Sequence, residues 1–117
     1  MLILTAHYDH LGTDGKEIYY GADDDGTGTV ALMEIAEAFA KAKKEGKGPR
    51  RSVLITPVAG EEKGLLGLEY YTKNPIFPLE KTVADLNIDM IGRLDEKHLN
   101  NPDYVYVIGS KKLSTEL

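Results

Sequence analysis

Cysteine is absent from the 117 residues of the sequence. Disulfide bonds and thiolate metal sites are therefore excluded, and any bound metal ion would have to be held by histidine, aspartate and glutamate side chains. Long apolar runs are absent as well, so the sequence predicts no membrane-spanning helix and no membrane partner. Residues 1–4 are apolar but too few to form the core of a signal peptide.

A surplus of basic residues is also missing. The 14 Lys and Arg residues are outnumbered by 19 Asp and Glu residues, which gives a formal net charge of -5. A nucleic-acid partner is therefore not expected, because such partners require a basic surface. The length suits one small domain, and the hydrophobic share of 42% and the charged share of 28% are ordinary for a globular protein.

Strand-like apolar runs alternate with segments of helical periodicity. One helix is expected after the acidic residues 23–25, because Leu32, Ile35 and Phe39 recur at helical spacing. Strands are expected at residues 2–6, 52–59, 83–88 and 104–108, further helices at 65–71 and from Gly109 onward, and a hairpin that turns at Asp14-Gly15. Pro57 is expected to disturb its strand locally, because proline lacks a ladder donor. This alternation predicts an α/β fold with a largely parallel or mixed sheet covered by helices.

Three adjacent carboxylates stand directly before the first expected helix. The stretch reads Gly21-Ala22-Asp23-Asp24-Asp25-Gly26-Thr27-Gly28. A solvated turn would tolerate such a cluster, since Asp and Gly both favour turns. A bound cation would make the cluster favourable, because it reverses the repulsion between the carboxylates. Residue types alone do not decide which of the three aspartates would be the ligand.

Side chains that can bind metal stand at the ends of three expected strands. His7 and Asp9 follow the first strand, Glu61 and Glu62 the second, and Asp89 the third. The carboxyl ends of neighbouring parallel strands meet at one edge of a sheet, where α/β folds bind their ligands. Because oxygen ligands with one or two imidazoles suit zinc, manganese or cobalt, the pattern predicts a metal centre at that edge.

Each of these residues also has a simpler interpretation. His7 could be a hydrogen-bonded histidine at a strand end. Glu61 and Glu62 could form an exposed first turn favoured by the helix dipole, and Asp89 could be a turn or cap residue. These interpretations would all have to hold together at several strand ends, so the metal centre is favoured.

Four motifs of the sequence together resemble the M28 family of zinc aminopeptidases. They are Ala6-His7-Tyr8-Asp9, Gly21-Ala22-Asp23-Asp24-Asp25-Gly26-Thr27-Gly28, Gly60-Glu61-Glu62-Lys63-Gly64-Leu65-Leu66-Gly67 and Asn87-Ile88-Asp89-Met90-Ile91-Gly92. Their order and approximate spacing match the family as well, and they cover most of the chain.

The resemblance implies a fold and a set of metal ligands. The fold would be an α/β/α sandwich around a mixed, largely parallel sheet. His7 and Asp89 would hold one zinc ion, Glu62 would hold a second, and Asp24 would bridge the two. The resemblance alone selects Asp24 over the neighbouring aspartates, and it implies a cis peptide bond between Asp24 and Asp25.

The resemblance also implies a hydrolytic mechanism. Two zinc ions would polarise the scissile carbonyl and activate water, with Glu61 as the general base. Asp9 would orient His7 from outside the ligand shell. The substrate would be a peptide with a free N-terminus, and the implied location is secreted or periplasmic.

The sequence departs from the family pattern after Asp89. The family supplies one more zinc-ligating histidine well downstream, and the chain ends before that position. His98 is too close to Asp89 and lacks the surrounding motif, so His98 and His10 are assigned structural roles. We therefore expect residues 1–117 to be the N-terminal part of a catalytic domain, with at most one tightly bound zinc ion and little activity alone. We also expect self-association through an exposed strand edge and apolar helix faces.

Other functions remain open. His7-Tyr8-Asp9-His10 partly resembles the metallo-β-lactamase motif, but Thr5 stands where that motif needs its first histidine. A noncatalytic binding module on the same scaffold is a second alternative, since fold does not fix function. Such a module would normally have lost ligands, whereas every ligand position covered here is intact. Among enzymes, related zinc carboxypeptidases and a cyclase are further alternatives.

Overall fold

The computed structural model describes residues 1–109 of the chain. In chain order the elements are β1 (Leu2–His7), β2 (Gly12–Asp14), β3 (Glu17–Tyr19), α1 (Gly26–Lys44), β4 (Val53–Val58), α2 (Leu66–Lys73), the short 3-10 helix η1 (Leu79–Lys81) and β5 (Ala84–Asn87). The order β4-β1-β5 builds a sheet in which each neighbouring pair is parallel. Strands β2 and β3 form a separate antiparallel hairpin.

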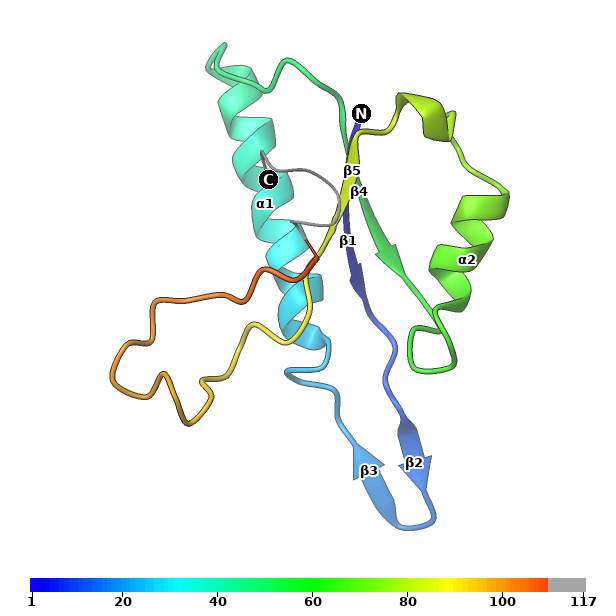
Figure 1. Ribbon diagram of the computed structural model, residues 1–117, viewed down its shortest axis with the longest axis vertical. Coiled ribbons are helices and arrows are strands. Elements are labelled where there is room, and N and C mark those ends of the chain that lie inside the picture. The colour runs from blue at the N-terminus through cyan, green and yellow to red at the C-terminus, as the bar shows by residue number, and fades with distance from the viewer. Residues whose placement is uncertain (110–117) are drawn as a thin grey trace.

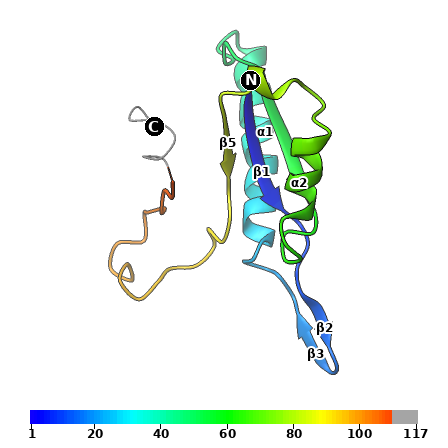
Figure 2. The ribbon, with the colours of Figure 1, turned by 45° about the vertical axis from the view of Figure 1, so that its right-hand side comes forward.

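The sheet lies between two helices, which gives the expected α/β/α layering (Figures 1 and 2). Helix α1 packs against β1 and β4. Side chains alternate between the faces of a strand, so Ile3 and Thr5 point away from α1. These two residues line a small cavity together with Leu68 and Tyr71 of α2. The α/β fold predicted from the alternation of elements is thus confirmed.

The central strand β1 is buried along almost its whole length. Leu4 and Ala6 form a cluster with Leu32 of α1, and Leu32 is 1% exposed. Burial of one such leucine side chain stabilises the fold by about 1.5–3 kcal/mol. A strand covered on both faces needs apolar residues at successive positions, which explains the continuous apolar run at the start of the sequence.

Asp25 is the N-cap residue directly before α1, and its side chain connects the helix to the chain beyond β5. Its side chain is buried, and Oδ1 accepts hydrogen bonds from the backbone N–H of Gly28 at 2.9 Å and of Met90 at 3.1 Å. The first bond caps the helix, a contribution worth about 0.5–2 kcal/mol. The second bond holds the segment after β5 against the start of α1.

The expectation of a strand at residues 104–108 is wrong. Residues 101–109 contain no strand in the structure, and Val105, Val107 and Ile108 are exposed. The run of aromatic and β-branched residues is typical of a strand, but β-propensity mainly reports packing against neighbours. Within the described residues this segment is not paired with any strand. The helix expected from Gly109 onward lies almost wholly outside the described residues.

Two smaller expectations are also corrected. Pro57 lies inside β4 opposite Ala6, and the register continues on both sides without a break. Within the described sheet β4 is an edge strand, where a missing donor can face away from the ladder. The hairpin turns at Gly15 and Lys16, one residue later than expected, and Asp14 is the last residue of β2. Within residues 1–109, no helix has both the length and the apolar character needed to cross a membrane.

Candidate metal centre

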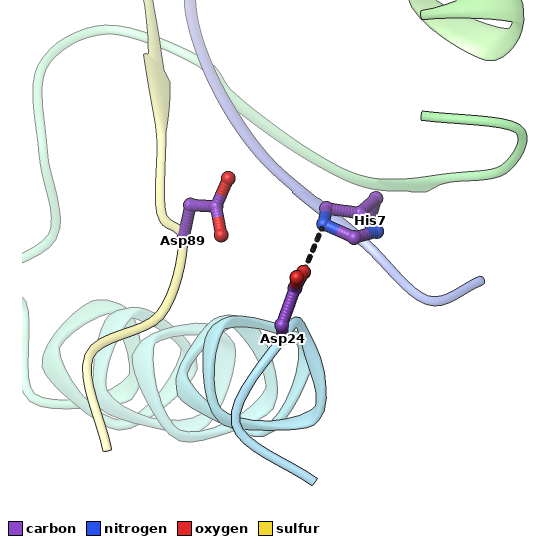
Figure 3. A group of neighbouring side chains, drawn as sticks. All are labelled: His7, Asp24 and Asp89. Atoms are coloured by element: carbon purple, nitrogen blue, oxygen red, sulfur yellow. Dashed lines mark ion pairs between the residues drawn. The ribbon is translucent and has the colours of Figure 1, made fainter. Parts of the chain in front are cut away.

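The strand order brings the predicted site residues to one edge of the sheet. Strand β1 is central, so His7 at its end lies between the chain that leaves β4 and the chain that leaves β5. The first of these carries Glu61 and Glu62, and the second carries Asp89. Asp24 approaches from the start of α1 at the same edge, and Figure 3 shows it with His7 and Asp89.

His7, Asp24 and Asp89 point toward a common centre. The distance from His7 Nε2 to Asp24 Oδ1 is 3.1 Å. One ligand atom from each of the three residues lies within 4.8 Å of the other two. Ligands bound about 2 Å from a single zinc ion lie within roughly 4 Å of one another, so only small adjustments would be needed. The convergence expected from the strand ends is therefore present.

Asp9 fixes the orientation of the His7 ring through its main chain. His7 Nδ1 lies 3.0 Å from the Asp9 carbonyl oxygen, whereas the Asp9 carboxylate is 3.6 Å away. With the proton on Nδ1, the ring donates to this carbonyl and its Nε2 lone pair faces Asp24.

The carboxylate of Asp9 contacts the backbone of the chain after β4. It accepts hydrogen bonds from the backbone N–H groups of Glu61 at 3.2 Å and Glu62 at 3.4 Å. Burial alone would raise the pKa of Asp9, but these backbone hydrogen bonds hold that pKa below its ordinary value. Asp9 therefore connects the end of β1 to the glutamate pair that follows β4.

The carboxylates of the three adjacent aspartates have three different sets of neighbours. Asp23 Oδ1 accepts from the backbone N–H of Gly92 at 2.9 Å, and Asp25 caps α1. Asp24 is the one whose carboxylate faces His7. The peptide bond between Asp24 and Asp25 is cis, as the resemblance implies.

His10 lies closer to the site than sequence reasoning expected. Its Nδ1 is 2.8 Å from Glu62 Oε1 and 4.0 Å from Asp24 Oδ2. No strand-end pattern identifies this residue; its nearness to His7 in the sequence was the one available signal. His98 lies apart from the candidate ligands and pairs with Asp95, with its ring stacked on Tyr104 at a centroid distance of 3.8 Å.

The charges at this edge favour a cation. Burial raises the pKa of Asp89, and the negative charges of Asp24 and Glu62 raise it further against the opposing effect of His7. Burial alone would lower the pKa of His7, but the hydrogen bond to Asp9 and the surrounding carboxylates, Asp89 among them, raise it overall. Several carboxylates around one imidazole thus stabilise positive charge at this point.

A pocket opens beside these side chains. It has a volume of about 590 Å³, within the range of sites that hold small ligands. Asp24, Asp89 and His10 line one part of it, and Tyr104 and Tyr106 line another. A ligand in this pocket would lie next to the convergent carboxylates.

The fold and the site together define an α/β protein with a candidate metal centre beside a ligand-sized pocket. The family model described as peptidase family M28 matches residues 1–114, and the chain belongs to that family.

Curated relatives are identical to this chain at between about a third and two fifths of the aligned positions. A vacuolar membrane protease of Verticillium alfalfae is 34% identical over 85 residues, which is 73% of this chain and 8% of the relative. A probable zinc metalloprotease of Leptosphaeria maculans is 34% identical over 93 residues, 77% of this chain and 20% of the relative. A probable glutamate carboxypeptidase of Arabidopsis thaliana is 38% identical over 80 residues, 68% of this chain and 12% of the relative. The chain thus spans a fifth or less of the length of these relatives, and no solved structure matches it.

Proposed function

We propose that this chain forms the metal-binding core of a zinc-dependent exopeptidase of the aminopeptidase type. The convergence of His7, Asp24 and Asp89 beside an open pocket carries this proposal. Membership of peptidase family M28 and relatives named zinc metalloprotease support peptide hydrolysis and zinc. Relatives named glutamate carboxypeptidase make a carboxypeptidase the second candidate.

The donor atoms suit zinc. His7, Asp24 and Asp89 would hold one ion through one imidazole nitrogen and two carboxylates, the three protein ligands that catalytic zinc sites commonly use. Asp24 and Glu62 would contribute to a second position. Bound zinc would supply a polarised scissile carbonyl and a water of lowered pKa.

Glu61 would move the proton. Its Oε2 lies 3.9 Å from His7 Nε2, so it is beside the candidate ligands without belonging to the convergent group of His7, Asp24 and Asp89. The hydrogen bond from its backbone N–H to Asp9 holds it at the edge of the sheet. In this position the carboxylate would take the proton of the attacking water and pass it to the leaving amine.

The acidic wall of the pocket would receive the substrate's free amino group. Asp23 and Asp95 line the pocket and are not among the proposed zinc ligands, so a peptide ammonium group would be attracted to them. A blocked N-terminus carries no charge and gains nothing there. Arg93 lines the same pocket and would attract a free peptide carboxylate, so the carboxypeptidase stays the second candidate.

The test compares two substrates in an active protein that contains this sequence. We expect hydrolysis of an aminoacyl anilide, and about 10- to 150-fold slower hydrolysis of the same anilide with an acetylated amino group, since the loss of a charge-assisted contact costs about 1.5–3 kcal/mol. A chelator should abolish the reaction and added zinc should restore it. Preference for acetylated peptides with a free C-terminus would instead favour the carboxypeptidase, and activity that survives the chelator would contradict a metal mechanism.

A further inference from the structure

Basic residues gather at the end of the sheet opposite the candidate metal centre. Helix α1 starts beside that centre and ends before β4 begins, so its last turn lies where β1 and β4 start (Figure 1). Residues 41–51 contain six of the 14 Lys and Arg residues of the chain and one acidic residue, Glu45. The short helix η1 lies at the same end, because Val83 donates its backbone N–H to the Met1 carbonyl just before β1. We call this set of exposed cations the basic edge: Lys41, Lys43, Lys44, Lys47, Arg50, Arg51 and Lys81.

We propose that the basic edge docks the protein on an anionic lipid surface. A bilayer that contains anionic lipids attracts clustered Lys and Arg side chains, and each cation near the surface strengthens binding by about fivefold. The sequence predicts no membrane partner from its overall charge and its lack of long apolar runs, but neither property describes one local surface. The proposal is independent of zinc and of the proposed peptidase activity.

Backbone contacts hold the cations at the end of α1 close together. The Lys47 N–H bonds to the Ala42 carbonyl oxygen at 2.8 Å, so the chain turns back on the helix. Gly46, whose φ is +73°, permits this turn, as glycine commonly does just after a helix. Gly48 then lies against the helix, because a Cβ at this position would be 3.1 Å from Lys43 Cα. The basic residues after α1 therefore stay beside those of its last turn.

The helix dipole accounts for only part of this cluster. Cations in the last turn of a helix are favourable by themselves, and the last turn of α1 contains three lysines. That effect falls off within the last turn, whereas Arg50 and Arg51 follow the end of the helix and Lys81 belongs to η1. A charged partner outside the chain accounts for all of these residues together.

The opposite charges of the molecule are separated along the strands. Strand β1 has six residues and spans about 20 Å at about 3.3 Å per residue. The Debye length at physiological salt is about 8 Å, so an anionic surface at the basic edge is largely screened from the carboxylates at the other edge. The net charge of -5 therefore does not prevent the contact. Docked in this way, the carboxyl edge and its pocket face away from the lipid.

Exposed apolar side chains stand beside the basic edge. The segment between α2 and η1 contains Ile76, which is 70% exposed, and Phe77, which is 47% exposed. Figure 1 shows this segment at the same end of the sheet as the last turn of α1. Apolar side chains next to cations suit a lipid surface, where they enter the boundary between headgroups and acyl chains. A nucleic acid would pair with the cations but would give Ile76 no apolar environment.

The experiment measures sedimentation of the 117-residue chain with lipid vesicles. One set of vesicles is pure phosphatidylcholine, and the other contains about one third phosphatidylserine. We expect binding to the anionic vesicles at low salt, little binding to the neutral ones, and loss of binding at about 1 M salt, where the Debye length is about 3 Å. A short DNA duplex with no lipid present serves as the competing partner.

Two triple variants remove equal charge from opposite ends of the molecule. Lys44→Gln, Arg50→Gln and Arg51→Gln together should weaken binding to anionic vesicles by about 100-fold, at about fivefold for each cation. The matched control replaces three exposed lysines away from the basic edge with glutamine and should bind as the wild type does: Lys16, Lys63 and Lys97. Ile76→Ser with Phe77→Ser should weaken vesicle binding by at least about tenfold and leave its salt dependence unchanged.

Acetylation of lysines in the wild type maps the bound face without any substitution. Anionic vesicles should protect Lys44, Lys47 and Lys81 from the reagent and leave Lys16 and Lys63 reactive. Absence of binding to anionic vesicles, equal binding to neutral ones, equal losses in the two triple variants, or protection of Lys16 and Lys63 would each overturn the proposal. Tighter binding to the DNA duplex than to the vesicles, unaffected by the changes at Ile76 and Phe77, would replace the lipid surface with a nucleic acid.

Discussion

Replacing Glu61 with glutamine is expected to lower turnover of an aminoacyl substrate by about two to four orders of magnitude in an active protein that contains this sequence, the range for a lost general acid–base. Zinc affinity should stay within about threefold of the parent, because Glu61 is proposed as a base and not as a ligand. The amide keeps the size of the side chain and the backbone bond to Asp9 but cannot accept the proton. Steady-state kinetics and zinc titration on the same preparation measure the two effects.

Glu62→Gln is the matched comparison for this variant. Glu62 is adjacent in sequence and its backbone N–H bonds to the same Asp9 carboxylate, but its side chain faces His10 and Asp24. We expect Glu62→Gln to weaken metal binding as well as turnover. Turnover of Glu61→Gln near the parent's value, with zinc bound, would remove Glu61 from its proposed role.

Replacing Asp24 with alanine is expected to weaken zinc binding at both positions together, by at least about 100-fold each, because loss of an outer-shell partner alone already costs about 10–100-fold. Among residues 1–109, Asp24 is the one residue common to two convergent groups, which are His7, Asp24 and Asp89 and His10, Asp24 and Glu62. The substitution removes one ligand from each of the two groups. His7 and His10 then lose the carboxylate that lies between their rings. Isothermal titration of the metal-free chain with zinc measures both affinities.

Asp23→Ala is the control, because it removes the same charge one residue earlier. The Asp23 carboxylate accepts from the Gly92 backbone and from the Thr27 hydroxyl, so its loss should loosen the chain after β5 more than it weakens zinc binding. Equal losses of zinc affinity in the two variants would show that overall negative charge, and not Asp24 itself, governs binding.

The fold was predictable where the pattern and the packing agree. The apolar run of β1 is buried on both faces, and the helical spacing of α1 places Leu32 in the core. Residues 104–108 are equally rich in strand-forming residues but form no strand in the described structure, because pairing depends on a neighbour that a local pattern does not contain.

The site was predictable in outline for a topological reason. Carboxyl ends of parallel strands share an edge, so His7, Glu61 and Asp89 had to approach one another once β4, β1 and β5 were neighbours. The roles within Asp23, Asp24 and Asp25 were not predictable from residue type. They depend on which backbone N–H groups each carboxylate meets, and two of those groups, on Met90 and Gly92, lie more than 60 residues away.

His10 was missed because its position depends on contacts outside its own motif. It belongs to the loop after β1, not to a strand end, and its placement depends on Tyr19 and on the close approach of Gly21. Neither contact can be inferred from the spacing of His7 and His10.

We propose above that His7, Asp24 and Asp89 together hold a metal ion. The most direct measurement is anomalous diffraction at the zinc absorption edge from crystals of the zinc-loaded chain. We expect an anomalous peak about 2.0–2.2 Å from His7 Nε2 and from one carboxylate oxygen each of Asp24 and Asp89, the usual zinc–ligand distances. A peak elsewhere on the chain, with His7 Nε2 bonded only to protein or water, would contradict it.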